Sequence, residues 1–134
     1  MDVEYGNVNK LDTQSTGWFI GFSDWTKCII TDDSGLRFVP SEAQLKGLCV
    51  KWMQHHKGDP RGYNKPVSIG RTVSILVSDT GGFRLEFCME KNFQIDEKKS
   101  YLLQNQGDFV IWGSQLYHQA IVEKDSTILT IRWE

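Results

Sequence analysis

The sequence predicts an all-β protein of a single domain, and three observations lead to this prediction. The chain has 134 residues, close to the commonest size of one domain. Turn residues recur at intervals that suit short strands and leave little room for helices. Between the turns, apolar and polar residues alternate with the period typical of a strand. A sandwich, a jelly roll or a small barrel accommodates such strands, because each protects its sheet edges.

Seven segments have the alternation or the β-branched and aromatic content of strands. They are residues 17–22, 48–55, 72–78, 83–89, 109–112, 118–123 and 127–133. The turn 78–82, SDTGG, predicts a hairpin between the strands on either side of it. The segment 41–46, SEAQLK, begins with an N-cap serine and predicts a short helix. Residues 1–45 are expected to form strands or an extension packed on a barrel made by residues 46–134.

Composition and charge exclude several classes of protein. Hydrophobic residues make up 40% of the chain and charged residues 24%, as in ordinary globular domains. The net charge is −2 and the charges are mixed, so no basic face attracts nucleic acid. No apolar stretch approaches the roughly 20 residues that span a bilayer, and the N-terminus lacks the order of a signal peptide. We therefore expect a cytoplasmic protein with neither a nucleic-acid nor a membrane partner.

Three cysteines, Cys28, Cys49 and Cys88, are an odd set without CxxC spacing. This pattern argues against a disulfide framework and against a thiolate metal site. Cys49 and Cys88 are expected to be small strand residues.

A motif stands at residues 107–118, GDFVIWGSQLYH. Its spacing resembles the second motif of the cupins, G-x5-P-x-G-x2-H-x3-N. Gly107 and His118 occupy the glycine and histidine positions, whereas other residues replace the proline, the second glycine and the asparagine. The resemblance implies a cupin-like jelly-roll β-barrel, also called a double-stranded β-helix.

The first cupin motif, G-x5-H-x-H-x4-E-x6-G, can be laid on the chain from Gly58 without a gap. Asn64 and Pro66 then replace the two histidines, and Arg71 replaces the glutamate. A guanidinium there opposes a metal ion, because two like unit charges about 4 Å apart repel by roughly 4 kcal/mol at an effective dielectric constant of about 20. Only His118 is kept of the family's metal ligands, so we expect no metal and no other cofactor.

Strand parity predicts which side chains enter a pocket. Arg71 shares a strand face with Val73 and Ile75, so it faces inward if they form the core. It could then pair with an internal carboxylate such as Glu86, or with the carboxylate or phosphate of a ligand.

The two neighbouring histidines, His55 and His56, are expected on opposite faces of their strand. If Leu48, Val50 and Trp52 face inward, His56 shares their face and converges with His118. A twist or bulge at the strand end would reverse the parity and put His55 inside instead.

The preferred interpretation is a binding module that holds a small anionic or sugar-like ligand without a metal. The aromatic side chains that flank the turn before His118 are expected to wall the pocket near the barrel mouth. The candidate ligand-binding residues are Arg71, His56, His118, Trp112, Tyr117 and Asn64.

Three alternatives stay open. One is a metal-independent isomerase or epimerase of sugar nucleotides, with His118 or His56 as the base and Tyr63 or Tyr117 as the acid. Another is a metal-dependent enzyme using His55 or His56, together with His118 and Asn64. The third is an interaction protein without a small-molecule ligand, and a homodimer is expected in any case, since two-fold pairs are the commonest assemblies.

Overall fold

The computed structural model describes residues 1–27, 35–63, 65–93 and 97–134. In this part of the chain the protein is all-β, which confirms the predicted class. The strands are β1 (Val3–Asn7), β2 (Leu48–His55), β3 (Arg71–Leu76), β4 (Thr80–Cys88), β5 (Lys99–Asn105), β6 (Asp108–Trp112), β7 (Tyr117–Lys124) and β8 (Ser126–Trp133). The helical elements there are short 3-10 turns at Val8–Lys10, Asp24–Lys27 and Pro60–Gly62. No helix among the described residues has the length and apolar content to cross a bilayer.

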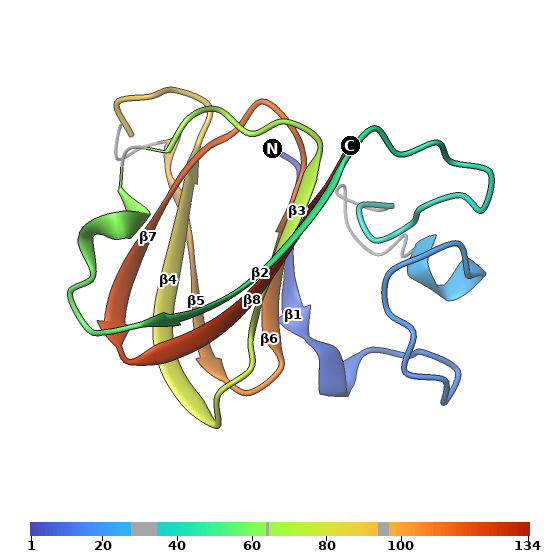
Figure 1. Cartoon of the computed structure of the whole chain (residues 1–134), viewed down its shortest axis with the longest axis horizontal. Helices are drawn as coiled ribbons and strands as arrows, with labels where there is room; N and C mark the ends of the chain where they lie inside the picture. The colour runs from blue at the N-terminus through green and yellow to red at the C-terminus, as the bar shows by residue number, and fades with distance from the viewer. Residues whose placement is uncertain (28–34, 64, 94–96) are drawn as a thin grey trace.

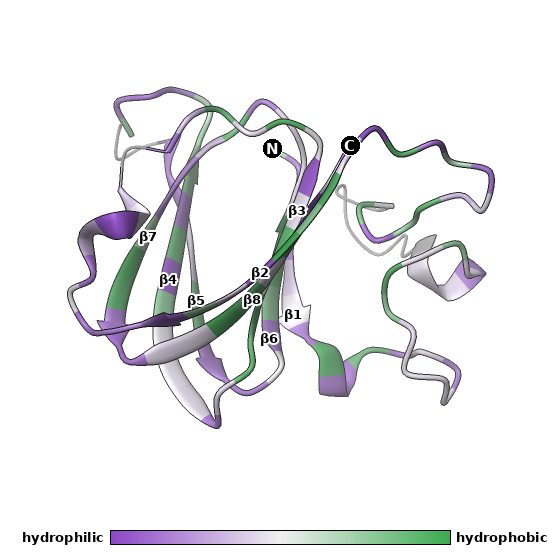
Figure 2. Ribbon diagram, in the orientation of Figure 1, coloured by the Kyte–Doolittle hydropathy of each residue, from purple (hydrophilic) through white to green (hydrophobic). Residues whose placement is uncertain are grey.

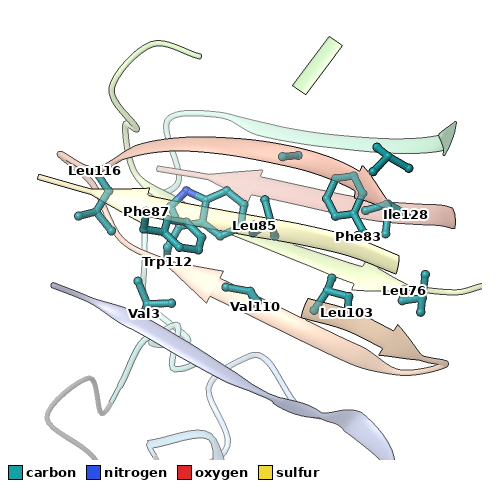
Figure 3. Packing of buried hydrophobic residues seen from close by; sticks show 12 residues of the cluster. Val3, Leu76, Phe83, Leu85, Phe87, Leu103, Val110, Trp112, Leu116 and Ile128 are labelled. Carbon is teal, nitrogen blue, oxygen red and sulfur yellow. The ribbon is translucent and has the colours of Figure 1, made fainter. Parts of the chain in front are cut away.

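Two antiparallel sheets pack face to face (Figure 1). The larger sheet has the strand order β1-β6-β3-β8-β2, and the smaller sheet has the order β5-β4-β7. The core between them draws buried side chains from both sheets: Val3, Leu76, Phe83, Leu85, Phe87, Leu103, Val110, Trp112, Leu116, Ala120, Val122 and Ile128. Figure 3 shows these side chains filling the space between the strands.

Alternation along β4 produces the inner face of the smaller sheet. Phe83, Leu85 and Phe87 are buried and point toward the larger sheet, because residues two apart on a strand share a face. Hydrophobic and hydrophilic bands follow one another along this strand in Figure 2. The inner face of β4 therefore forms an apolar wall.

A second apolar core lies on the opposite face of the larger sheet. Val73 and Ile75 of β3 belong to it, together with Phe109, Ile111 and Trp133. The chain between β1 and β2 supplies its cover: buried Leu36 and partly buried Val8, Leu11, Phe19, Ile20 and Val39. This N-terminal cover lies to one side of the sandwich in Figure 1.

The predicted hairpin at SDTGG is wrong. β3 and β4 follow each other in the chain but belong to different sheets, so the turn between them is a crossing from one layer to the other. Gly81 allows the close packing at this corner, because a Cβ there would lie 2.7 Å from both Leu76 and Ser126. The glycines of this turn therefore serve a crossing between layers and not a hairpin.

Other differences fall where local patterning is weak. The strand predicted at 17–22 is absent apart from one bridge between Gly21 and Phe38. The helix predicted at 41–46 is also absent, and all of these residues are exposed. A helix that short needs a packed face to offset the cost of nucleation. β1 and β5 form although the alternation did not predict them.

The cysteines of the described residues follow the prediction. Cys49 lies on β2 and Cys88 on β4, and both are free thiols. Cys28 lies outside the described residues.

Candidate functional site

A cavity of about 480 Å³ lies between the two sheets. Its walls are the inner faces of β2, β3 and β8 on one side and of β4 and β7 on the other. Six residues of the loop before β3 line it as well: Arg61, Gly62, Lys65, Pro66, Val67 and Ser68. Its volume falls within the roughly 300–1,000 Å³ typical of small-molecule sites.

Strand register arranges the polar wall of the cavity in rows across the larger sheet. The first row, from β2 to β6, contains Cys49, Arg132, Thr72 and Trp112. The second row contains Lys51, Thr130 and Ser74. Hydroxyl groups thus occupy the middle of the wall, where Ser74 and Thr130 are hydrogen-bonded at 2.9 Å. The positive charges stand nearer the β2 edge.

Three cations gather at this edge: Lys51, Arg132 and Lys65, the last from the loop. Among the described residues none of them has a salt bridge, and no Asp or Glu lines the cavity. Burial lowers the pKa of Lys51, and the positive charges of Lys65 and Arg132 lower it further. The cavity is therefore a place where an anion would be stabilised.

Two buried polar atoms belong to neighbouring rings from the two sheets, Nε1 of Trp112 and Nδ1 of His118. Both atoms are buried without a hydrogen-bond partner in the described structure, and both residues line the cavity. The two rings lie with their centroids 5.0 Å apart. Burial lowers the pKa of His118 to about 4, helped by the positive charges of Lys65, Lys51 and Arg132. The imidazole is therefore neutral at pH 7.

The opposite wall of the cavity is apolar. Phe83 and Leu85 of β4 and Ala120 of β7 form it. Phe87 does not line the cavity but packs against Trp112, with the two ring centroids 5.1 Å apart (Figure 3). The site thus combines a charged rim, a hydroxyl-bearing wall and an apolar wall, a combination suited to an amphiphilic molecule.

At the end of the cavity away from Trp112, a carboxylate holds the imidazole of His55. Nδ1 of His55 lies 3.0 Å from Oδ2 of Asp59, and both side chains are buried. Hydrogen bonds from Arg61 hold the pKa of Asp59 well below its usual range. Since an ionised carboxylate only accepts, His55 carries its proton on Nδ1 in this contact. Burial lowers the pKa of His55, although Asp59 opposes this, so Nε2 is available as a base.

The histidine on β2 that lines the cavity is His55, so the prediction that His56 faces inward is wrong. Leu48, Val50 and Trp52 lie on the outer face and are 62%, 59% and 63% exposed. β2 is an edge strand, and its inner face carries the polar side chains while its apolar face meets solvent. His56 is exposed, with Nδ1 3.8 Å from Asp125.

Arg71 also differs from its predicted place. It does share a face with Val73 and Ile75, but that face carries the second core and not the cavity. One of its terminal nitrogens donates hydrogen bonds to the carbonyls of Gly35, Leu36 and Phe38. The guanidinium therefore holds the N-terminal cover on the sheet, and the expectation that it enters the pocket is wrong.

The remaining predicted residues divide between inside and outside. Trp112 and His118 line the cavity. Tyr117 precedes His118 on β7 and faces the other side of the sheet, because strand neighbours alternate. Tyr63 is exposed and does not line the cavity. Asn64 lies outside the described residues.

The three histidines do not converge, because only His55 and His118 reach the cavity. In the described ranges no group of three or more His, Cys, Asp or Glu side chains is placed to hold a metal ion. Glu86, the carboxylate suggested for Arg71, pairs with Lys98 at 3.0 Å.

The residues of this candidate site that the sequence did not indicate are Lys51, Lys65 and Arg132, which line the cavity, and Asp59, which contacts His55. Lys51 and Arg132 had a usable signal, because each alternates with apolar neighbours on its strand. Alternation alone left open which of the two faces was the inner one.

Comparison with protein-family models, with curated proteins and with solved structures gives no match to this chain. The features that bear on its function are the charges, the unpaired polar atoms and the volume of the cavity.

Proposed function

We propose that this protein binds a small organic anion, without a metal, in the cavity between its two sheets. The observation that carries the proposal is the cluster of Lys51, Lys65 and Arg132 around one cavity that no carboxylate of the described residues lines. Like charges held together are unfavourable in the unliganded protein. An anion relieves this repulsion, so part of its binding free energy comes from charges already in place.

The proposed architecture is the cupin-like jelly roll. The strand order supports it, since β2-β8-β3-β6 stands opposite β7-β4-β5. The loop before β3 runs beside β7, where a further strand would complete two four-stranded layers. Gly58 N donates to Val122 O and Ser68 N to Leu116 O, both at 2.9 Å. In this arrangement His118 faces the interior, as the second cupin motif implies.

Isothermal titration tests the binding of anions. Benzoate, hexanoate, phenyl phosphate and glucose 6-phosphate are titrated at pH 7 against benzyl alcohol as an uncharged reference. We expect at least one anion to bind more tightly than the alcohol, and we expect added salt to lower the affinity of that anion. Lys51→Met should lower the affinity for that anion by about 10-fold to 100-fold, which corresponds to the loss of a hydrogen bond to a charged group.

Lys99→Met is the matched control, because Lys99 is exposed on β5 and does not line the cavity. It should bind like the unaltered protein. If no anion binds more tightly than benzyl alcohol, or if both lysine variants lose affinity equally, the proposal is rejected.

The contact between His55 and Asp59 favours a second candidate, a metal-independent isomerase or epimerase acting on sugar nucleotides. Nε2 of His55 would take a proton from a substrate carbon, and the electron pair would delocalise onto the adjacent carbonyl. The proton is then returned to carbon, so no co-reactant is consumed. Incubation of nucleotide sugars in D₂O should place deuterium on that carbon, and His55→Gln should abolish the exchange. An unaltered protein that exchanges no carbon-bound proton would exclude this activity.

The homodimer expected from the sequence stays a prediction. β2 forms one edge of the larger sheet, and its outer face exposes Leu48, Val50 and Trp52. Light scattering would measure the mass in solution, and a monomer would contradict the expectation.

A further inference from the structure

We infer that the ligand is an amphiphilic carboxylate, with its charged head at the end of the cavity formed by Trp112, His118 and Arg132 and its apolar body lying along β4 toward Phe83. This end of the cavity is called the Trp112 end. The inference rests on the proposed binding of an anion, and adds where the anion lies and what is attached to it.

The unpaired indole N–H of Trp112 places the head. The side chain is only 2% exposed, yet its Nε1 has no acceptor among the described residues. The indole N–H group can only donate a hydrogen bond, so only an acceptor can satisfy it. Buried donors without a partner are rare and unfavourable, which indicates that something absent from the chain supplies the acceptor. An oxygen of the head would meet this need.

His118 contributes a second polar atom at the same end. Its Nδ1 is buried and has no hydrogen-bond partner in the described part of the chain, and its ring lies beside that of Trp112. A neutral imidazole can carry its proton on Nδ1 and donate to the same head. Two donors at one place match the two oxygens of a carboxylate.

The charges of the rim surround this end. Arg132 belongs to the same row as Trp112, with Thr72 between them. Lys51 stands in the next row of the sheet, and Lys65 reaches the cavity from the loop. These side chains supply the positive potential that attracts the head, and hydrogen bonds from the two ring nitrogens would orient it.

The apolar body follows from the rest of the wall. From Cys49 to Met53, both of which line the cavity, β2 advances four residues, or roughly 13 Å at the usual rise of a strand. Over this length Leu85 and Phe83 face the cavity from the opposite sheet. A ring or an alkyl chain would cover these side chains, whereas a bare ion would leave them exposed to water.

Nuclear magnetic resonance of the indole N–H groups tests the position of the head directly. The protein has five tryptophans, and the signal of Trp112 is assigned as the one lost in Trp112→Phe. Titration with octanoate should move this signal downfield, as expected for a new hydrogen bond. The signal of Trp52, which is 63% exposed on the outer face, should stay in place. Binding of octanoate without movement of the Trp112 signal would overturn the placement.

The same titration reports on His118. The groups that face it with charge or titrate near it are Lys51 and Cys49 from β2, Arg132 from β8 and Lys65 from the loop. A carboxylate among them offsets the positive charges, so octanoate should raise the pKa of the imidazole measured from its ring carbon-bound protons. An unchanged pKa in the saturated complex would contradict contact with His118.

A chain-length series tests the apolar body. Affinity should increase about fourfold per methylene from acetate to octanoate, since each buried methylene contributes a similar amount. Trp112→Phe should lower the affinity for octanoate about tenfold, and Trp52→Phe should leave this affinity unchanged.

The outcomes separate this inference from the proposed function. If acetate and octanoate bind equally well, the body is not recognised and the inference fails while anion binding stands. If octanol binds as tightly as octanoate, the charge is not recognised and the proposed function fails. If Trp112→Phe does not fold, the indole signal of the unaltered protein still decides the position of the head.

Discussion

Phe87→Ala is expected to lower the free energy of unfolding by about 3–5 kcal/mol. The side chain is fully buried on β4, and its ring lies against those of Trp112 and Tyr101 at 5.1 Å and 6.0 Å. Truncation removes its burial and leaves a void that rigid neighbouring strands cannot fill. Urea denaturation followed by far-ultraviolet circular dichroism gives the change.

Phe22→Ala is the matched control for this truncation, because Phe22 is 68% exposed. Its free energy of unfolding should stay within about 0.5 kcal/mol of that of the unaltered protein. Equal losses in the two variants would contradict a core built around β4. A Phe87→Ala protein that stays as stable as the unaltered protein would contradict it as well.

The free energy of unfolding is expected to decrease as the pH falls from about 6.5 to about 4. The pKa of His118 is about 4 in the folded protein, against 6.5 for a free imidazole. Between these values the unfolded chain binds a proton at this residue and the folded protein does not. The contribution of His118 to stability therefore rises with pH across this range by about 3 kcal/mol, and it is constant above the range.

Thermal and urea unfolding at half-unit intervals of pH measure this slope. His118→Gln should remove the part due to His118, whereas His56→Gln, at an exposed position, should keep it. Some slope of the same sign should remain in His118→Gln, because burial lowers the pKa of His55 too. A stability that increases on acidification through this range would show that His118 is not buried beside cations.

Local patterning predicted much of the fold. β2 forms over the predicted residues, and the predicted strands at 109–112, 118–123 and 127–133 differ from β6, β7 and β8 by at most one residue at each end. These segments combine alternation with β-branched or aromatic residues, so their own residues favour strand. β1 and β5 lack that signal, and they form because they pair with β6 and β4. Such pairing joins residues far apart in the chain and is invisible to a local pattern.

The candidate site was predicted only in part. Trp112 and His118 were expected at the pocket and do line it. Arg71 and His56 were placed there through correct parity and the wrong choice of face. The alternation along a strand shows which side chains share a face. It does not show which face lines the cavity, because a sheet covered on both sides has two apolar faces. At β3 the N-terminal cover, to which Arg71 donates hydrogen bonds, buries the second face, whereas at β2 the apolar face that His56 was expected to share is exposed.

The sequence alone determined the all-β class, most strand positions and which side chains alternate together, because these depend on neighbours along the chain. Only the tertiary structure decided which sheet each strand joins and which face encloses the cavity. It also brought Lys51, Lys65 and Arg132 together from separate segments. The reason is that layer packing and long-range pairing are set by the burial of whole faces against one another, and no short stretch of sequence contains both partners.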